Sequence, residues 1–433
     1  MKRVKNKMVK LKKLFLAPVL LGGTASIDSQ KLEEIVAGNL GPNYSSSAEQ
    51  FSQQQNGYFD YMAAIDFLMK NDFDNRSNVR LSNSRNGKST YLHEIKALVT
   101  EYARVIDLVK QGNRKQVYAD PLFIETRDDI QIQKIGVNTF HIPRLLFYDA
   151  YQNFSSGNSA KGTQSFIDIL TFGERMAGSG GTRNYIRGTS LESIAFNEAE
   201  NLLPRMSQND LKNLERICSD ILKYNSLGGM LQARLPHQLK LIGRIISEGY
   251  MGVQMEGNVV DEVTAKTISE QIAKLNPAQK QALNETAGRA LFNHVNSYLD
   301  MLARPEKEWK AIGSPDIYFP SFGNLATLFD LVDSPVPTVL HTAIEQRTRY
   351  RLLLLHSKVE QYRWEHNELP ISLDELKDSK AIFDPLTGEK FKYKHEKGRL
   401  GYELYSNGLN NTEFQTGKIF LAPKRGDNIA RRT

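Results

Sequence analysis

Three glutamates in one segment have the residue type and the spacing that acid–base catalysis uses. Glu192, Glu198 and Glu200 fall in the stretch SLESIAFNEAENLL, which has the apolar spacing of a helix. Glu192 and Glu200 are eight residues apart, so they lie on roughly the same side of that helix, two turns from each other. Paired carboxylates can give and take protons in a reaction. The alternative interpretation, which the sequence favours, is a solvated helix face.

Histidine and cysteine occur without a recognisable pattern. No histidine stands in an HxH, HExxH or Cys/His array, the local pairs that transition-metal sites favour, although distant residues can also assemble a site. The single cysteine, Cys218, occupies an apolar position of a predicted helix with no base beside it, so we expect a buried small hydrophobe. The sequence therefore assigns no catalytic, cofactor-binding or metal-binding residue. The eight histidines are His93, His141, His237, His294, His341, His356, His366 and His395.

The string NGKST at residues 86–90 has the letters that end a phosphate-binding loop. That loop needs a glycine five residues before Gly87, where this chain has Ser82, and an apolar strand upstream, which NVRLSNSR is not. We interpret the string as a polar turn in which Ser89 or Thr90 caps the helix that begins at Tyr91. The GSGG at 178–181 follows a helix and lacks the context of a dinucleotide fingerprint. No nucleotide cofactor is predicted.

The first 26 residues have the composition of a secretory signal peptide. Residues 1–13 contain seven lysines and arginines and no acid, and an apolar run from Leu14 to Gly23 leads to the small residues at 24–26. That run is about half of the ~20 residues that a membrane-spanning helix needs. We therefore expect a cleaved signal peptide and a periplasmic or secreted protein. The alternative is a basic tail that stays attached and touches the membrane.

The net charge of +7 reflects this N-terminal segment. The chain has 56 basic and 49 acidic residues, and seven of the basic ones lie in residues 1–13, so the remainder carries 49 of each. Binding of nucleic acid needs clustered basic charge. We therefore expect no nucleic-acid partner.

The rest of the chain predicts a mainly α protein with two or three domains. Polar residues 27–56 indicate a linker or arm, and residues 57–336 have the period of an irregular multi-helix body without a fixed repeat. Breaks are expected at Gly228–Gly229 and at 178–181. The predicted helices are Tyr58–Met69, Tyr91–Lys110, Leu145–Phe154, Thr163–Met176, Leu191–Leu203, Leu211–Tyr224, Leu239–Met255, Val260–Leu275, Pro277–Leu302 and Val339–His366.

Residues 337–433 predict a small C-terminal α+β module. A long helix to His366 would span roughly 45 Å, and a turn at Asp384–Gly388 precedes two alternating strands of a hairpin. A third strand is expected in KIFL at 418–421. We expect the helix to place its apolar face on the hairpin, Trp364 to pack on the strands and the basic side chains to face solvent. The apolar face comprises Leu355, Val359 and Tyr362, the hairpin residues are Phe391, Tyr393, Tyr402 and Leu404, and the basic residues are Arg347, Arg349, Arg351, Lys358 and Arg363.

Three motifs of this module, in order, resemble the globular C-terminal part of type II secretion major pseudopilins. They are YRWEHNELP at 362–370, Asp384–Pro385 and ELYSNG at 403–408, and the match covers about 60 residues. The order is similar also to the C-terminal module of large uncharacterised cell-envelope proteins of planctomycete-type bacteria, in which the helical passage 144–214 has a counterpart. The pseudopilin GFTLIE-type membrane helix is absent. The family's acidic calcium loop becomes LNNTEF at 409–414, where only Glu413 offers a carboxylate, so calcium is not expected.

Two functions fit these observations. The first is a non-catalytic interaction or structural protein of the bacterial envelope that binds another envelope protein, with membrane contact only through an uncleaved N-terminal segment. The second is an envelope hydrolase whose catalytic site is assembled from distant residues. The lack of a recognisable nucleophile or metal motif favours the first, whereas converging carboxylates or histidines would favour the second.

Overall fold

The computed structural model describes residues 54–85, 89–115, 118, 129–178, 182–223, 225–248, 262–313, 317–320, 322–325, 329, 336–376, 382–395, 401–408 and 419–420. The predicted signal peptide, almost all of the polar arm and the LNNTEF segment lie outside these residues. The described chain is mainly helical with a small C-terminal α+β module, as the sequence predicts.

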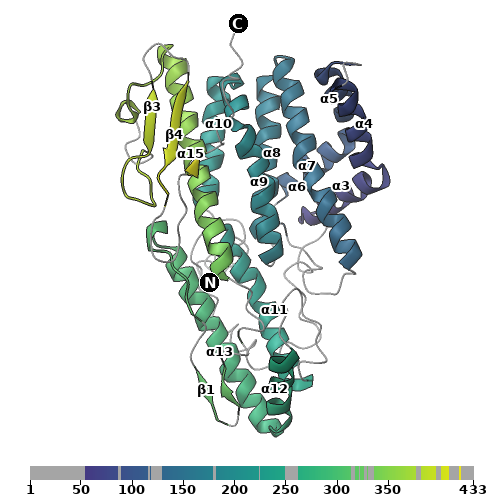
Figure 1. Ribbon diagram of the computed structural model, residues 1–433, viewed down its shortest axis with the longest axis vertical. Helices are drawn as coiled ribbons and strands as arrows, with labels where there is room; N and C mark the ends of the chain where they lie inside the picture. Colours follow the sequence, from purple (N-terminus) through teal and green to yellow (C-terminus); the bar gives the residue numbers. More distant parts are fainter. Residues whose placement is uncertain are drawn as a thin grey trace, which may run out of the picture.

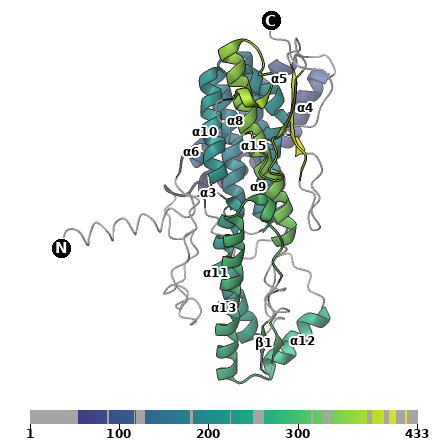
Figure 2. The same ribbon diagram turned by 90° about the vertical axis from the view of Figure 1, so that its left-hand side faces the viewer.

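The helices form a body and an arm (Figures 1 and 2). Helices α7, α8, α9 and α10 stand side by side with α15, while α11 and α13 run together toward the far end of the molecule, where α12 also lies. The helices are α3 (Tyr58–Lys70), α4 (Phe73–Arg85), α5 (Tyr91–Glu101), α6 (Ala103–Arg114), α7 (Asp129–Ser155), α8 (Ser159–Gly178), α9 (Thr182–Leu202), α10 (Gln208–Lys223), α11 (Ser226–Glu248), α12 (Glu262–Ala273), α13 (Pro277–Leu302) and α15 (Val336–His366), with short 3₁₀ turns η1 (Leu203–Arg205), η3 (Glu306–Glu308) and η4 (Leu373–Glu375).

Several helix starts follow from their capping residues. Thr90 accepts a hydrogen bond from the backbone of His93, as expected for the cap of α5. Asn276 forms a capping box with Gln279 at the start of α13, and Ser207 exchanges hydrogen bonds with Asp210 at the start of α10. These side chains satisfy backbone donors that the first helical turn leaves unpaired.

Several predicted helix boundaries are wrong. The starts expected at Leu145, Leu191 and Leu239 are too late, because α7, α9 and α11 begin earlier in the chain, and α4 was not predicted. The helix expected over Tyr91–Lys110 is two helices that meet at Tyr102, which is buried, stacks edge-on against Phe73 and donates its hydroxyl to the Asn71 carbonyl. The break expected at Gly228–Gly229 lies inside α11. There a Cβ on Gly228 would lie 3.5 Å from Leu299, an ordinary van der Waals distance, so the packing does not require glycine. The helix continues because Leu227, Met230 and Leu231 are buried, which offsets the cost of about 1 kcal/mol that glycine carries inside a helix.

The C-terminal module has the predicted order. Ser372 and Glu375 form a capping box on η4, and Gly388 closes the Asp384 turn with a φ of 75°. Strands β3 (Lys392–His395), β4 (Tyr402–Ser406) and β5 (Ile419–Phe420) form an antiparallel sheet in the order β3-β4-β5, so the third strand is confirmed. A second, two-stranded sheet of β1 (Tyr318–Phe319) and β2 (Gly323–Asn324) was not expected.

Helix α15 joins this module to the body. It packs on α10 and α9 on one side and on β4 and β5 on another, and one hydrophobic cluster runs from the N-terminal helices through α15 to the hairpin. Leu355 and Val359 are fully buried in that cluster, and His356 of α15 lies 2.8 Å from the Tyr402 hydroxyl of β4. Polar side chains within two turns of α15 can therefore reach either the helical body or the C-terminal module.

Candidate functional site: a buried polar network on α15

Two glycines bring helices α8 and α9 unusually close together. A Cβ on Gly173 of α8 would lie 2.4 Å from Cγ of Glu192, and a Cβ on Gly188 of α9 would lie 2.4 Å from the Gly173 carbonyl oxygen. No side chain larger than hydrogen fits at such distances without a shift of the backbone. The close crossing therefore places the Glu192 side chain directly against α8.

Glu192 is buried in this crossing, so the predicted solvated face is wrong for this residue. It is fully buried, whereas Glu198 is half-buried and Glu200 is exposed. The carboxyl that Glu192 meets is not Glu200 but Glu174, one residue after Gly173 on α8 and 8% exposed. Two carboxyl groups thus converge, from different helices and not from the same one.

Polar side chains from three helices surround the two carboxyls. Gln346 of α15 donates its amide to Oε2 of Glu192 and to the Thr189 carbonyl. The Tyr350 hydroxyl, one turn further along α15, lies near Glu192, and Ser226 of α11 hydrogen-bonds to Glu174. Among the described residues, Oε1 of Glu192 and the Tyr350 hydroxyl have no hydrogen-bond partner of normal geometry.

Burial controls the protonation of this pair. It raises the pKa of Glu174 from the ordinary 4.5 to about 7, against the opposing effects of the Glu192 contact and the Arg347 charge. Burial also raises the pKa of Glu192 well above 4.5, and the charge of Glu174 raises it further, while the Gln346 amide acts in the opposite direction. Removal from water disfavours the charged form of a carboxyl, so the pair binds protons more tightly than exposed glutamates do.

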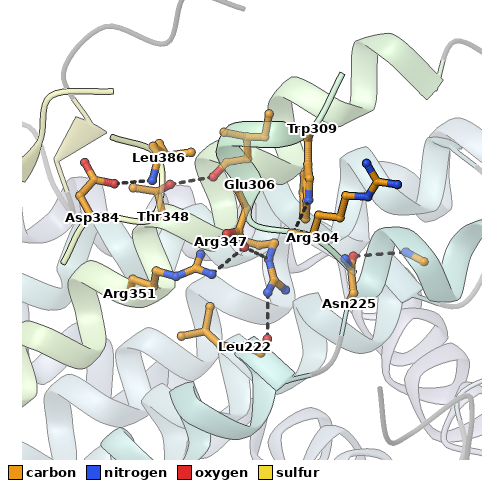
Figure 3. Close-up of polar contacts among 12 residues, drawn as sticks. Leu222, Asn225, Arg304, Glu306, Trp309, Arg347, Thr348, Arg351, Asp384 and Leu386 are labelled. Carbon is orange, nitrogen blue, oxygen red and sulfur yellow. Dashed lines mark hydrogen bonds and ion pairs between the residues drawn. The ribbon is translucent and has the colours of Figure 1, made fainter. Parts of the chain in front are cut away.

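A second part of the network centres on Glu306 of η3 (Figure 3). Its Oε1 accepts from Nε of Arg347 at 2.8 Å and from Nη2 of Arg351 at 2.6 Å. Arg347 also donates to the Leu222 carbonyl at the end of α10, and its guanidinium lies 5.7 Å from the centre of the Trp309 ring. Burial pushes the pKa of Glu306 upward, but the two arginines together hold it below 4.5, so Glu306 is ionised.

The basic residues of α15 do not follow the prediction that they mostly face solvent. Arg347 and Arg351 reach inward to Glu306, Lys358 lies 2.6 Å from Glu215 of α10, and Arg363 pairs with Glu360. The side chains of these four bases are only 16–21% exposed. A helix between two packed layers has little solvated face, so its long bases reach acids of neighbouring elements. Trp364 is 47% exposed, and its indole N–H donates to the Met206 carbonyl between η1 and α10.

The other candidate residues are not brought together. Cys218 is buried, as predicted, and burial raises the pKa of its thiol. His356 is buried against Tyr402, with a pKa that burial lowers to about 3, and His141 is buried beside Phe73 with Asp74 at 3.8 Å. No group of three or more His, Cys, Asp or Glu side chains in the described part of the chain could hold a metal ion.

The NGKST string, which has the letters that end a phosphate-binding loop, contributes its last two residues to the local structure at the start of α5. Ser89 donates to Glu94, while residues 86–88 of the NGKST string lie outside the described part of the chain. Within the ranges that the structure covers, no helix is long and apolar enough to cross a membrane. Among the described residues, the network of α8, α9, α15 and η3 is the one that brings two carboxyls together, and its carboxyl groups are buried.

Comparison with known proteins gives no relative: no family model, no curated protein and no solved structure matches this chain.

Proposed function

We propose that this chain is a secreted or periplasmic interaction or structural protein of the bacterial envelope, without catalytic activity. Residues 1–26 direct its export. The C-terminal module resembles that of pseudopilins in the order of its elements: a long helix, a capped turn, the Asp384–Gly388 turn and an antiparallel hairpin support the resemblance. The module binds a protein partner of the envelope.

Exposed apolar side chains on this module carry the proposal. Ile371, between α15 and η4, is 80% exposed, and Phe383, at the start of the Asp384 turn, is 45% exposed. Both stand on ordered backbone, because the Ile371 amide donates to Glu375 and Phe383 forms an isolated bridge with Lys390. Apolar side chains held out to solvent on a rigid frame offer a protein partner a contact that needs little rearrangement.

The alternative, an envelope hydrolase, is favoured by one observation: the converging carboxyls of Glu174 and Glu192. A general acid or base must come within hydrogen-bonding reach of its substrate. Both carboxyls are instead enclosed by α8, α9, α11 and α15. Their position fits a role inside the fold better than a role in a reaction.

A photo-crosslinking amino acid at these positions tests the interaction in living cells. We expect Ile371 and Phe383, each replaced in the full-length chain, to yield a covalent adduct with the same envelope protein. Glu200 of α9 is the control, because it is exposed but lies outside the module. The proposal is contradicted if neither module position gives an adduct, or if the control gives the same adduct with equal yield.

A further inference from the structure

The contact between Glu174 and Glu192 joins two groups that cannot bond while both are ionised. A carboxylate accepts hydrogen bonds and donates none. The two carboxyls lie within hydrogen-bonding reach of each other, and no donor from the described residues reaches Oε1 of Glu192. A proton on one of them converts this repulsive contact into a donor–acceptor pair.

We propose that Glu174 and Glu192 form a buried proton-binding site that locks α8 and α9 to α15, and that loss of its proton loosens this junction. Glu192 is the donor and Glu174 the acceptor. The proposal concerns the body of the protein and does not depend on the partner of the C-terminal module.

The charged groups nearby favour ionisation of only one carboxyl of the pair. The positive charge of Arg347 acts on Glu174, whereas Arg351 has Glu306 and the buried Asp384 as its negative partners. A second ionisation would bury a second negative charge beside the first, which costs free energy in a low-dielectric interior. The polar and titratable groups that act on the pair are Arg347, Gln346 and Tyr350 from α15, Tyr185 from α9, Ser226 from α11 and, through Tyr350, Cys218 from α10.

The sign of the pH effect follows from the direction of these shifts. Both carboxyls have a folded-state pKa above the ordinary 4.5, so folding takes up protons wherever the unfolded chain is ionised. Their contribution to stability is fully present below pH 4.5. The part from Glu174 is lost as the pH rises to about 7, and the part from Glu192 continues to fall above that pH.

The substitution Glu192→Gln distinguishes a pair that shares a proton from a pair in which both carboxyls are ionised. The glutamine amide imitates the protonated acid at every pH. The variant should therefore become more stable relative to the wild type as the pH rises from 6 to 8. Its folding equilibrium constant, divided by that of the wild type, should rise about tenfold per pH unit. Urea unfolding of the full chain at several pH values measures it, with Glu200→Gln as the exposed control on the same helix, for which the ratio should stay constant.

A second measurement does not need the variant to fold. Infrared difference spectra of the folded wild-type protein at pH 8 should show the carbonyl band of a protonated carboxylic acid. That band should disappear in Glu192→Gln, and in Glu174→Gln it should persist at a shifted frequency, because the acceptor of the Glu192 proton changes from a carboxylate to an amide. A ratio that stays constant between pH 6 and pH 8, or a wild-type spectrum without the acid band, would overturn the proposal.

Discussion

Replacing Glu306 with alanine should lower the free energy of unfolding by about 3–5 kcal/mol, the usual cost of removing one partner from a buried ion pair. The substitution leaves Arg347 and Arg351, whose side chains are only 17% and 21% exposed, without their shared carboxylate. It also removes the link between η3 and α15. Chemical denaturation of the full chain measures the loss.

The neighbouring acid on the same turn provides the control. Glu308 is exposed, so Glu308→Ala should change the free energy of unfolding by no more than about 0.5 kcal/mol. Changing Glu306 to alanine together with both arginines to methionine should recover part of the loss, because an apolar replacement leaves no buried charge. Equal effects of the two single substitutions would show that the ion pairs do not stabilise the junction.

Leu355→Ala should have the second large effect, a loss of about 2–5 kcal/mol, because it opens a cavity in a packed core. Leu355 is fully buried on the part of α15 that packs on the body and on the C-terminal sheet. Leu354, the preceding residue, is only partly buried, so Leu354→Ala should cost clearly less. Thermal and chemical unfolding compare the two variants, and an unchanged stability of Leu355→Ala would rule out the packing described for α15.

The sequence predicted those features that depend on local patterns. Apolar spacing located most helices, a capping residue marked the start of α5, and alternation predicted the hairpin. Cys218 was correctly expected to be buried, because its neighbours on the helix are apolar. In each case the residues that decide the structure lie within one or two turns of the chain.

The buried network could not be predicted in this way, because its members are distant in sequence. Gln346 lies 154 residues from Glu192, and Arg351 lies 45 residues from Glu306. Within its own segment Glu192 looks like Glu198 and Glu200, and only the close crossing at Gly173 and Gly188 separates it from them. Gly173 lies inside the predicted helix Thr163–Met176, but Gly188 precedes the predicted helix Leu191–Leu203. The pairing of two glycines at a helix crossing was therefore not visible until α9 was seen to begin at Thr182.

The central proposal is export to the envelope. The most direct test is to determine, in the organism that makes this protein, where the chain is located and with which residue it begins. Cell fractionation followed by intact-mass analysis and N-terminal sequencing would locate the chain and its first residue. We predict a periplasmic or secreted protein whose mature chain begins near Ser26 or Ile27. A full-length chain that begins at Met1 in the cytoplasm would contradict the account.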